Sequence, residues 1–292
     1  MKEKFIKDYK ENEKLRNSFF ELAHSVFGLD LKSWYEKGYW GSHYIPFSYA
    51  LDNQIIANVS VNVLNTVIEG KEKSAIQIGT VMTHPDYRNK GFSAKLMNQI
   101  LQEYEDKCDF IYLFANETVL DYYPKFGFIP TDEYQFSMDW DPSVQKPASI
   151  KKLNGTNPKD LAFIYQFAAE RLPVSQTFGT EQAKELLMFH CMNVFPEHIY
   201  YLPEEDVIAI FEKQEQQLQI YDLISKKAID IEAVVSKLAD ERTTNVYFHF
   251  TPDLEDAKLR RNLFNTSNQL FIRTKGNLSF PKAFKHPVTS QA

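Results

Sequence analysis

The sequence predicts a mixed α/β fold in which two domains follow one another, the second smaller than the first. Three observations support this expectation. The chain has 292 residues, which is enough for about two domains of ordinary size. Helical and strand-like patterns alternate along it, with one strand–loop–helix crossover in the first half. The order of these elements recurs in the second half, although no sequence repeat accompanies it.

The first half begins with a helical pattern and continues with three successive strand patterns, whose intervening turns favour an antiparallel meander. Apolar residues at helical spacing predict helices over residues 11–27, 93–104 and 118–125. Strand patterns occupy residues 46–50, 55–63, 76–83, 109–115 and 128–140, the last as a pair of strands. The segment 109–115 is nearly all apolar, as expected for a strand that is buried on both faces.

The second half starts after a proline-containing segment, Asp141–Pro147, which we predict to be the linker between domains 1–142 and 148–292. Helices are predicted over 160–171, 181–193, 230–238 and 254–264, and Asp230 is placed to cap the third of them. Strands are predicted over 199–202, 206–212, 218–225, 245–250 and 269–273.

The composition excludes several classes of protein. The net charge of −6 argues against a nucleic-acid-binding protein. The two cysteines, Cys108 and Cys191, are too far apart to predict a zinc site or a disulfide framework, so we expect no metal. No apolar stretch is long enough for a signal peptide or a membrane span, so we expect a cytoplasmic protein that does not bind membranes. Oligomerisation is left open.

A strand, a loop and a helix between Val81 and Met97 form the most informative segment of the chain. The loop, with the sequence RNKGFS from Arg88 to Ser93, ends at the N-terminus of the helix. Such a terminus offers unpaired N–H groups and the positive end of the helix dipole. Gly91 would let the backbone approach a phosphate closely, and Lys90 adds positive charge. The segment therefore predicts a site for a pyrophosphate group.

By itself the pattern R-x-x-G-x-[GSA] is weak, because average residue usage produces it in roughly one chain in five of this length. The alternative is an ordinary surface loop followed by a capped helix. The context favours the phosphate site, because a second motif, DYYPKFGF from Asp121 to Phe128, follows the strand 110–115. Tyr123 in this motif stands 35 residues after Arg88.

The two motifs together resemble those of the GNAT superfamily of acyl-CoA-dependent N-acyltransferases. The segment from Val81 to Ser93 resembles the acetyl-CoA motif of the family, and Tyr123-x-x-x-Gly127-Phe128 resembles the motif that follows it. The resemblance covers about residues 1–140 and is close over 76–130. It implies a GNAT fold, an N-terminal catalytic domain, and acetyl-CoA as the cosubstrate.

The resemblance also implies which residues bind this cosubstrate. The strand that ends at Thr83 would diverge from the strand 110–115, and its backbone would pair with the pantetheine arm in the gap. The loop after it would hold the pyrophosphate through backbone amides, and Asn116 would face the pantetheine or the acyl group. The implied cofactor-binding residues are Val81, Met82, Thr83, Arg88, Asn89, Lys90, Gly91, Phe92, Ser93 and Asn116.

Tyr123 is implied as the catalytic general acid that protonates the departing CoA thiolate. The pKa of a tyrosine hydroxyl is about 10, close enough to that of a thiol for this proton transfer. The spacing to Gly127 and Phe128 selects Tyr123 over its neighbour Tyr122. The alternative for Tyr123 is a plain core tyrosine.

The base that would take a proton from the attacking amine is left unassigned. Some family members have a glutamate on the strand that matches residues 76–83, but Gln77 stands at about that position here and cannot act as a base. A backbone N–H of the strand 81–83 would hold the oxyanion. Four side chains are candidates for the base, each with a structural role as the simpler explanation: His43, His84, Glu117 and Asp121.

Two further segments bear on the acceptor and on the second domain. The aromatic stretch from Trp34 to Phe47 lies where the family places acceptor-site elements, and it would line a pocket unless its rings are simply core. The second half resembles a degenerate GNAT-like domain by element order only. Its own strand-to-helix junction, residues 224–230, contains no glycine, so we expect it to lack the cofactor.

The resemblance therefore implies an N-acetyltransferase that transfers an acetyl group from acetyl-CoA to a primary amine of a small molecule or a peptide by direct attack. One alternative is a non-catalytic acyl-CoA-binding or regulatory protein, which the missing carboxylate at Gln77 favours. The other is an unrelated phosphate-binding protein that uses the Gly91 loop, which the Tyr123 motif disfavours.

Overall fold

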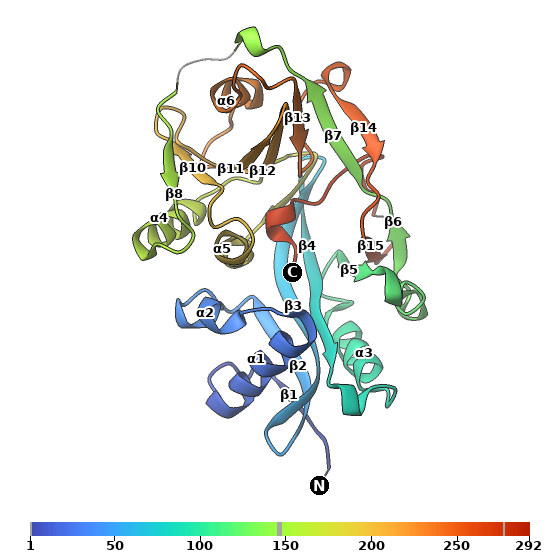
Figure 1. Ribbon diagram of the computed structural model, residues 1–292. Helices are drawn as coiled ribbons and strands as arrows, with labels where there is room; N and C mark the ends of the chain where they lie inside the picture. Colours follow the sequence, from blue (N-terminus) through green and yellow to red (C-terminus); the bar gives the residue numbers. More distant parts are fainter. Residues whose placement is uncertain (1, 145–147, 277) are drawn as a thin grey trace.

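The computed structural model describes residues 2–144, 148–276 and 278–292. The chain forms two lobes, each built on one mixed sheet, and a long hairpin of the lower lobe reaches the upper one (Figure 1). This arrangement confirms the predicted mixed α/β fold. Residues 145–147 of the expected linker lie outside the described ranges. No helix within these ranges is long and apolar enough to cross a membrane.

The first sheet contains eight strands, and α1 (Glu13–Phe27), α2 (Leu31–Glu36) and α3 (Phe92–Tyr104) belong to its lobe. The strands β2, β3 and β4 form the predicted antiparallel meander, and β4 then pairs in parallel with β5. In spatial order the strands are β1 (Lys4–Lys7), β2 (Tyr44–Leu51), β3 (Gln54–Ile68), β4 (Lys71–Thr83), β5 (Phe110–Asn116), β15 (Asn268–Thr274) and β6 (Ile129–Thr131), and β9 (Phe178–Glu181) pairs with β3.

The second sheet contains seven strands, accompanied by α4 (Pro158–Ala168), α5 (Lys184–Asn193) and α6 (Ile231–Leu238). Asp230 caps α6 as predicted, because its carboxylate accepts a 3.1 Å hydrogen bond from the N–H of Ala233. In spatial order the strands are β8 (Lys151–Leu153), β10 (Ile199–Leu202), β11 (Val207–Gln214), β12 (Gln217–Ser225), β13 (Asn245–Phe248), β7 (Tyr134–Asp139) and β14 (Arg260–Leu263).

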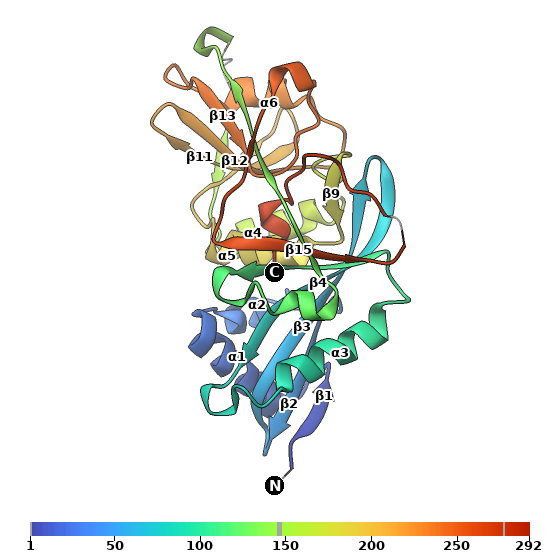
Figure 2. The ribbon, with the colours of Figure 1, turned by 90° about the vertical axis from the view of Figure 1, so that its right-hand side faces the viewer.

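The two sheets have the same topology, with one strand exchanged between the halves of the chain. From β1 and from β8, each sheet runs through an antiparallel meander, a parallel pair, one strand from the other half, and a short edge strand. The exchanged strands are β15, which completes the first sheet, and β7, which crosses to the second (Figure 2). The element order therefore reflects a repeated fold. The expected division at residues 142–148 does not separate the two sheets.

The helix expected over 118–125 consists of two 3₁₀ turns, Glu117–Val119 and Tyr123–Phe126. Three other expectations about individual elements are wrong. The two strands expected over 128–140 exist as β6 and β7, but they do not pair with each other, because they lie in different sheets. The helix expected over 254–264 is a single 3₁₀ turn, Asp256–Lys258, followed by β14, which pairs with β7. The helix expected from residue 181 starts at Lys184, because the preceding residues form β9. In each case, pairing with a distant strand overrides the local preference.

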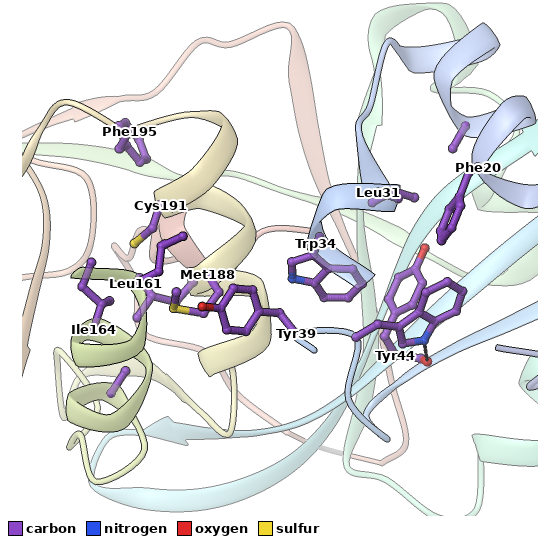
Figure 3. Packing of buried hydrophobic residues seen from close by; sticks show 14 of the residues in the cluster. Phe20, Leu31, Trp34, Tyr39, Tyr44, Leu161, Ile164, Met188, Cys191 and Phe195 are labelled. Atoms are coloured by element: carbon purple, nitrogen blue, oxygen red, sulfur yellow. Dashed lines mark hydrogen bonds between the residues drawn. The ribbon is translucent and has the colours of Figure 1, made fainter. Parts of the chain in front are cut away.

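The aromatic stretch after α1 is core, and it joins the two lobes (Figure 3). Trp34 is 2% exposed, and its indole N–H donates a 2.8 Å hydrogen bond to the carbonyl of Glu185 on α5. The ring of Tyr39 packs 5.1 Å from that of Tyr165 on α4. These rings fill the contact between α2, α4 and α5 instead of lining an open pocket, so the simpler explanation of the stretch holds.

A chain of buried polar groups ties the segment 284–292 to β4 and β5. The side-chain amide of Gln77 donates to the hydroxyl of Tyr112 (2.7 Å) and to the carbonyl of Ser290 (2.8 Å). Its oxygen accepts a hydrogen bond from the N–H of Ala292. The Tyr112 hydroxyl in turn lies 2.9 Å from Nε2 of His286. Gln77 and His286 are fully buried, so this network fixes the segment against the first sheet.

Acid is expected to destabilise the protein partly through His286. Burial lowers the pKa of His286 to about 3, whereas the pKa of a histidine in the unfolded chain is about 6.5. The unfolded state therefore binds more protons between these values, and this contribution to stability, present above pH 6.5, is lost as the pH falls towards 3. Urea unfolding between pH 7 and 5 should show a smaller loss of stability for His286→Gln than for the wild type. Equal losses would contradict this assignment.

Candidate functional site

The central feature of the candidate site is the divergence of two parallel strands. The register between β4 and β5 runs from the pair Ala75 and Phe110 to the pair Ile78 and Leu113, and it ends there. Both strands continue, β4 to Thr83 and β5 to Asn116. Among the described residues, the last residues of β4 therefore pair only with β3 as strands, and their edge towards β5 is available to another extended chain.

A bulge in β4 marks the point of divergence. Ser60 of β3 pairs with Gly79 and Asn58 pairs with Met82, so two residues of β4 stand opposite one residue of β3. One of the two, Thr80, has a φ of 50°, which is the left-handed region that a β-branched residue rarely adopts. The surrounding structure must hold this conformation in place.

A buried hydrogen-bond chain supplies that restraint, and the sequence analysis missed it. The side-chain amide of Asn58 donates to the carbonyl of Thr80 (2.8 Å) and to the hydroxyl of Ser60 (2.9 Å), and its oxygen accepts from Ser48 (2.8 Å). Asn58 is fully buried, so the loss of any of these hydrogen bonds would leave a buried polar group without a partner. The signal was present in the sequence as polar residues on one face of a strongly apolar strand. The full chain contains Tyr9, Ser48, Asn58, Ser60, Thr80 and Tyr44.

The loop after β4 leads into an uncapped helix. Gly91 is the N-cap residue of α3 with a φ of 77°, and no side chain among the described residues caps the helix. Its first N–H groups therefore point away from the helix without a capping partner. Asn89 is also left-handed, with a φ of 61°, so the loop turns sharply before the helix starts. The side chain of Phe92 is buried, so at this residue only the backbone is available to a ligand.

Two cationic side chains, Arg88 and Lys90, lie near this helix terminus. Neither Arg88 nor Lys90 forms an ion pair with a carboxylate among the residues that the structure describes. The guanidinium of Arg88 contacts the carbonyl of Thr83 at 3.4 Å, and the ammonium of Lys90 lies 4.7 Å from the centre of the Tyr87 ring. Unpaired cations beside free backbone N–H groups favour an anionic ligand such as a phosphate.

The structure brings the two sequence motifs together. The hydroxyl of Tyr122 donates a 2.9 Å hydrogen bond to the hydroxyl of Ser93 in the first turn of α3. Tyr123 lies beside it, 5% exposed, in the core cluster that β4, β5 and α3 share. Burial raises the pKa of Tyr123, so its hydroxyl is protonated at neutral pH. Within the described residues, that hydroxyl forms no hydrogen bond. It does not belong to the fully buried side-chain polar atoms that lack a partner.

The remaining predicted residues have local roles. The side-chain oxygen of Asn116 accepts hydrogen bonds from the N–H and the hydroxyl of Thr118, so it caps the 3₁₀ turn after β5. His84 caps the 3₁₀ turn Pro85–Tyr87, and His43 contacts the carbonyl of Gln182 at 3.4 Å. Glu117 and Asp121 are exposed. None of the four candidate bases has a contact that marks it as a base.

The second sheet repeats the divergence, but the chain itself occupies it. The register of β12 with β13 ends at Ile220, while β12 continues to Ser225. The carbonyl of Ser225 accepts a 2.8 Å hydrogen bond from the N–H of Leu172. Asp222, on the same stretch, accepts hydrogen bonds from Nη1 and Nη2 of Arg171, each at 2.8 Å. On this stretch of β12, the backbone carbonyl of Ser225 and the side chain of Asp222 thus already have partners within the chain.

Comparison with known proteins agrees with this geometry. Residues 11–131 match the family model described as an acetyltransferase (GNAT) domain. A probable N-acyltransferase from Enterococcus faecalis has a similar fold, with a TM-score of 0.64 at 17% identity over 94% of this chain and 72% of that one. No curated protein matches the sequence.

Two further solved structures share the fold across both halves. A GCN5-related N-acetyltransferase from Kribbella flavida has a TM-score of 0.57 at 13% identity, covering 94% of this chain and 72% of that one. One from Anabaena variabilis has a TM-score of 0.57 at 14% identity, covering 93% and 73%. The family model, the diverging strands and the two motifs coincide in the same part of the chain, and this part is similar to GNAT acetyltransferase domains.

Proposed function

We propose that this protein is an acetyl-CoA-dependent N-acetyltransferase that acts on a primary amine of a small molecule or a peptide. The observation that carries the proposal is the free edge of β4 beside the uncapped N-terminus of α3. An extended pantetheine arm would pair with Val81, Met82 and Thr83. The pyrophosphate would then lie on the backbone N–H groups of the loop that ends at Ser93, next to Arg88 and Lys90.

The residues present fit this ligand in charge and in shape. An ideal Cβ placed on Gly91 would have no heavy atom within 4 Å, so the space above the loop is open. The φ of 77° nevertheless favours glycine, and this conformation directs the following N–H groups outward. A pyrophosphate brings negative charge to a place where two cations have no carboxylate partner within the described ranges.

In the proposed reaction the neutral amine attacks the thioester carbonyl, and the carbonyl oxygen becomes negative. A backbone N–H on the free edge of β4 would stabilise that charge. As the carbonyl re-forms, the C–S bond breaks and Tyr123, whose buried hydroxyl is protonated, would donate its proton to the departing thiolate. The nitrogen that has formed the new C–N bond loses one proton to solvent, and Tyr123 regains one from solvent. Gln77 takes no part in proton transfer, because both its donors and its oxygen are committed to the network with the segment 284–292.

The second half is proposed to bind no acyl-CoA. The hydrogen bond between Leu172 and Ser225 takes the edge of β12 that a pantetheine arm would need. The ion pair of Arg171 and Asp222, with the hydroxyl of Thr289 at 2.6 Å from the same carboxylate, adds a second restraint. We infer that one acyl-CoA binds per chain, in the first lobe.

Titration of the protein with acetyl-CoA tests the binding site. We expect micromolar binding with a stoichiometry of one, and we expect Gly91→Glu to abolish it through the bulk and charge of the new carboxylate. Gly70→Glu is the matched control, because Gly70 has a similar φ of 71° and open space, but lies in the turn between β3 and β4. If wild type fails to bind, or if Gly91→Glu binds as well as wild type, the site is wrong.

The alternative function is a non-catalytic acyl-CoA-binding protein. It is favoured by the commitment of Gln77 to a structural network and by the lack of a marked base among the candidate side chains. A panel of primary amines, with CoA thiol release as the readout, separates the two functions. Binding of acetyl-CoA without thiol release for any amine of the panel would favour the alternative.

A further inference from the structure

The loop that carries Tyr123 crosses a strand from the other half of the chain. This loop leaves β5 after Asn116 and enters β6 at Ile129, and β15 lies between these two strands. The register pairs β15 with β5 from Asn268 to Thr274, and with β6 from Leu270 to Ile272. The strands at both ends of the loop therefore pair with the same strand, which comes from the second half of the chain.

Arg273 of β15 holds the end of this loop. Its Nη1 donates a 2.6 Å hydrogen bond to the carbonyl of Phe126, and its Nη2 bonds to the carboxylate of Glu105. The next residue, Gly127, has a φ of 78°, and a Cβ built on it would lie 2.3 Å from the same Nη1. The glycine of the Y-x-x-x-G-F motif thus provides both the turn and the space that the guanidinium occupies.

Phe271 of β15 holds the middle of the loop. It is 1% exposed, and its ring centre lies 5.8 Å from that of Tyr123. Residues two apart on a strand share one face, so Phe271 and Arg273 act on the loop from the same side of β15. The hydroxyl of Tyr123 forms no hydrogen bond within the described residues, so ring packing and the loop backbone determine its position.

We propose that Arg273, together with Phe271, is a positioning residue for Tyr123, so that the second half of the chain completes the catalytic site of the first. This inference rests on the proposed function, in which Tyr123 is the general acid. It gives the exchange of strands a role in the reaction, because the exchanged strand brings both positioning side chains to the loop.

Kinetics with the best amine of the panel test the effect on the reaction. For Arg273→Ala we expect kcat to fall roughly 10- to 100-fold, because a displacement of about 1 Å in a catalytic group costs up to about that much. The KM for acetyl-CoA should not change, since the loop at Gly91 is untouched. In a Tyr123→Phe background the same substitution should cause no further loss of kcat. Arg273→Lys keeps one donor and should recover part of the rate.

Lys275→Ala is the matched control, because Lys275 also pairs with a carboxylate next to α3, that of Asp106, but makes no contact with the loop. It should leave kcat unchanged. An equal loss of kcat in both variants, or a further loss in the Tyr123→Phe background, would overturn the positioning role.

Hydrogen exchange of the free protein tests the same inference without any turnover. In Arg273→Ala, and less strongly in Arg273→Lys, we expect faster exchange over residues 117–128 than in wild type, while α3 keeps its protection. Unchanged exchange over 117–128 would overturn the inference, whatever the kinetics. Failure of the wild type to release CoA with any amine would instead count against the proposed function, and the exchange result would still decide whether Arg273 orders the loop.

Discussion

Replacing Tyr123 by phenylalanine is expected to lower kcat by about 100- to 1,000-fold, with little change in the affinity for acetyl-CoA. The substitution removes one hydroxyl and keeps the ring, so its packing against Phe128 and Phe271 persists. Without that hydroxyl, the departing thiolate has to take its proton from water. The measurement is CoA thiol release at saturating acetyl-CoA, accompanied by a binding titration of the same variant.

Tyr122→Phe is the matched control for this prediction, because Tyr122 is the adjacent tyrosine, although it is only half-buried. Its hydroxyl bonds to Ser93 at the start of α3. We therefore expect Tyr122→Phe to weaken acetyl-CoA binding and to leave kcat close to that of the wild type. If the two variants behave the other way round, Tyr122 is the general acid, and the spacing argument from Gly127 and Phe128 fails.

Gln77→Glu is expected to destabilise the whole protein by about 3 kcal/mol at neutral pH. A carboxylate at this fully buried position has no hydrogens to donate, so the hydroxyl of Tyr112 and the carbonyl of Ser290 would each lose a donor. The new carboxyl would have no cation among the hydrogen-bond partners that Gln77 has in the described residues, so burying it in charged form, or protonating it instead, would cost free energy of folding. Urea unfolding followed by tryptophan fluorescence measures the effect, since Trp34 and Trp40 are buried in the core that joins the lobes.

The control for Gln77→Glu is Gln217→Glu, which makes the same change of charge at an exposed position at the start of β12. It should change the free energy of unfolding by less than about 0.5 kcal/mol. A stable Gln77→Glu protein would contradict the network. A Gln77→Glu protein with a higher rate of acetyl transfer would show that position 77 reaches the substrate.

Local patterns in the sequence predicted most of the elements. The helix α3, the meander and both motifs follow from apolar spacing and from the residues of the loop, all of which act within a few residues of each other. The partners of β7 and β15 could not be predicted in this way, because a strand pattern does not specify which edge the strand joins. The helix expected over 254–264 failed for the same reason, since its second half pairs with β7 as β14.

The same distinction between local patterns and distant contacts applies to the residues of the candidate site. The residues from Val81 to Ser93 and Tyr123 are close in sequence to the features that select them. Asn58 acts on Thr80 from a neighbouring strand, and Arg273 reaches Phe126 from 147 positions further along the chain. Neither residue belongs to a motif, and only the folded structure brings it to the site.

The exchange of β7 and β15 means that neither half of this protein is a self-sufficient unit. A chain limited to residues 1–142 would leave β5 and β6 without the strand that joins them, and would carry β7 without its sheet. Two open sheet edges and an unpaired strand favour aggregation. Each sheet is therefore complete only when both halves are present in one chain.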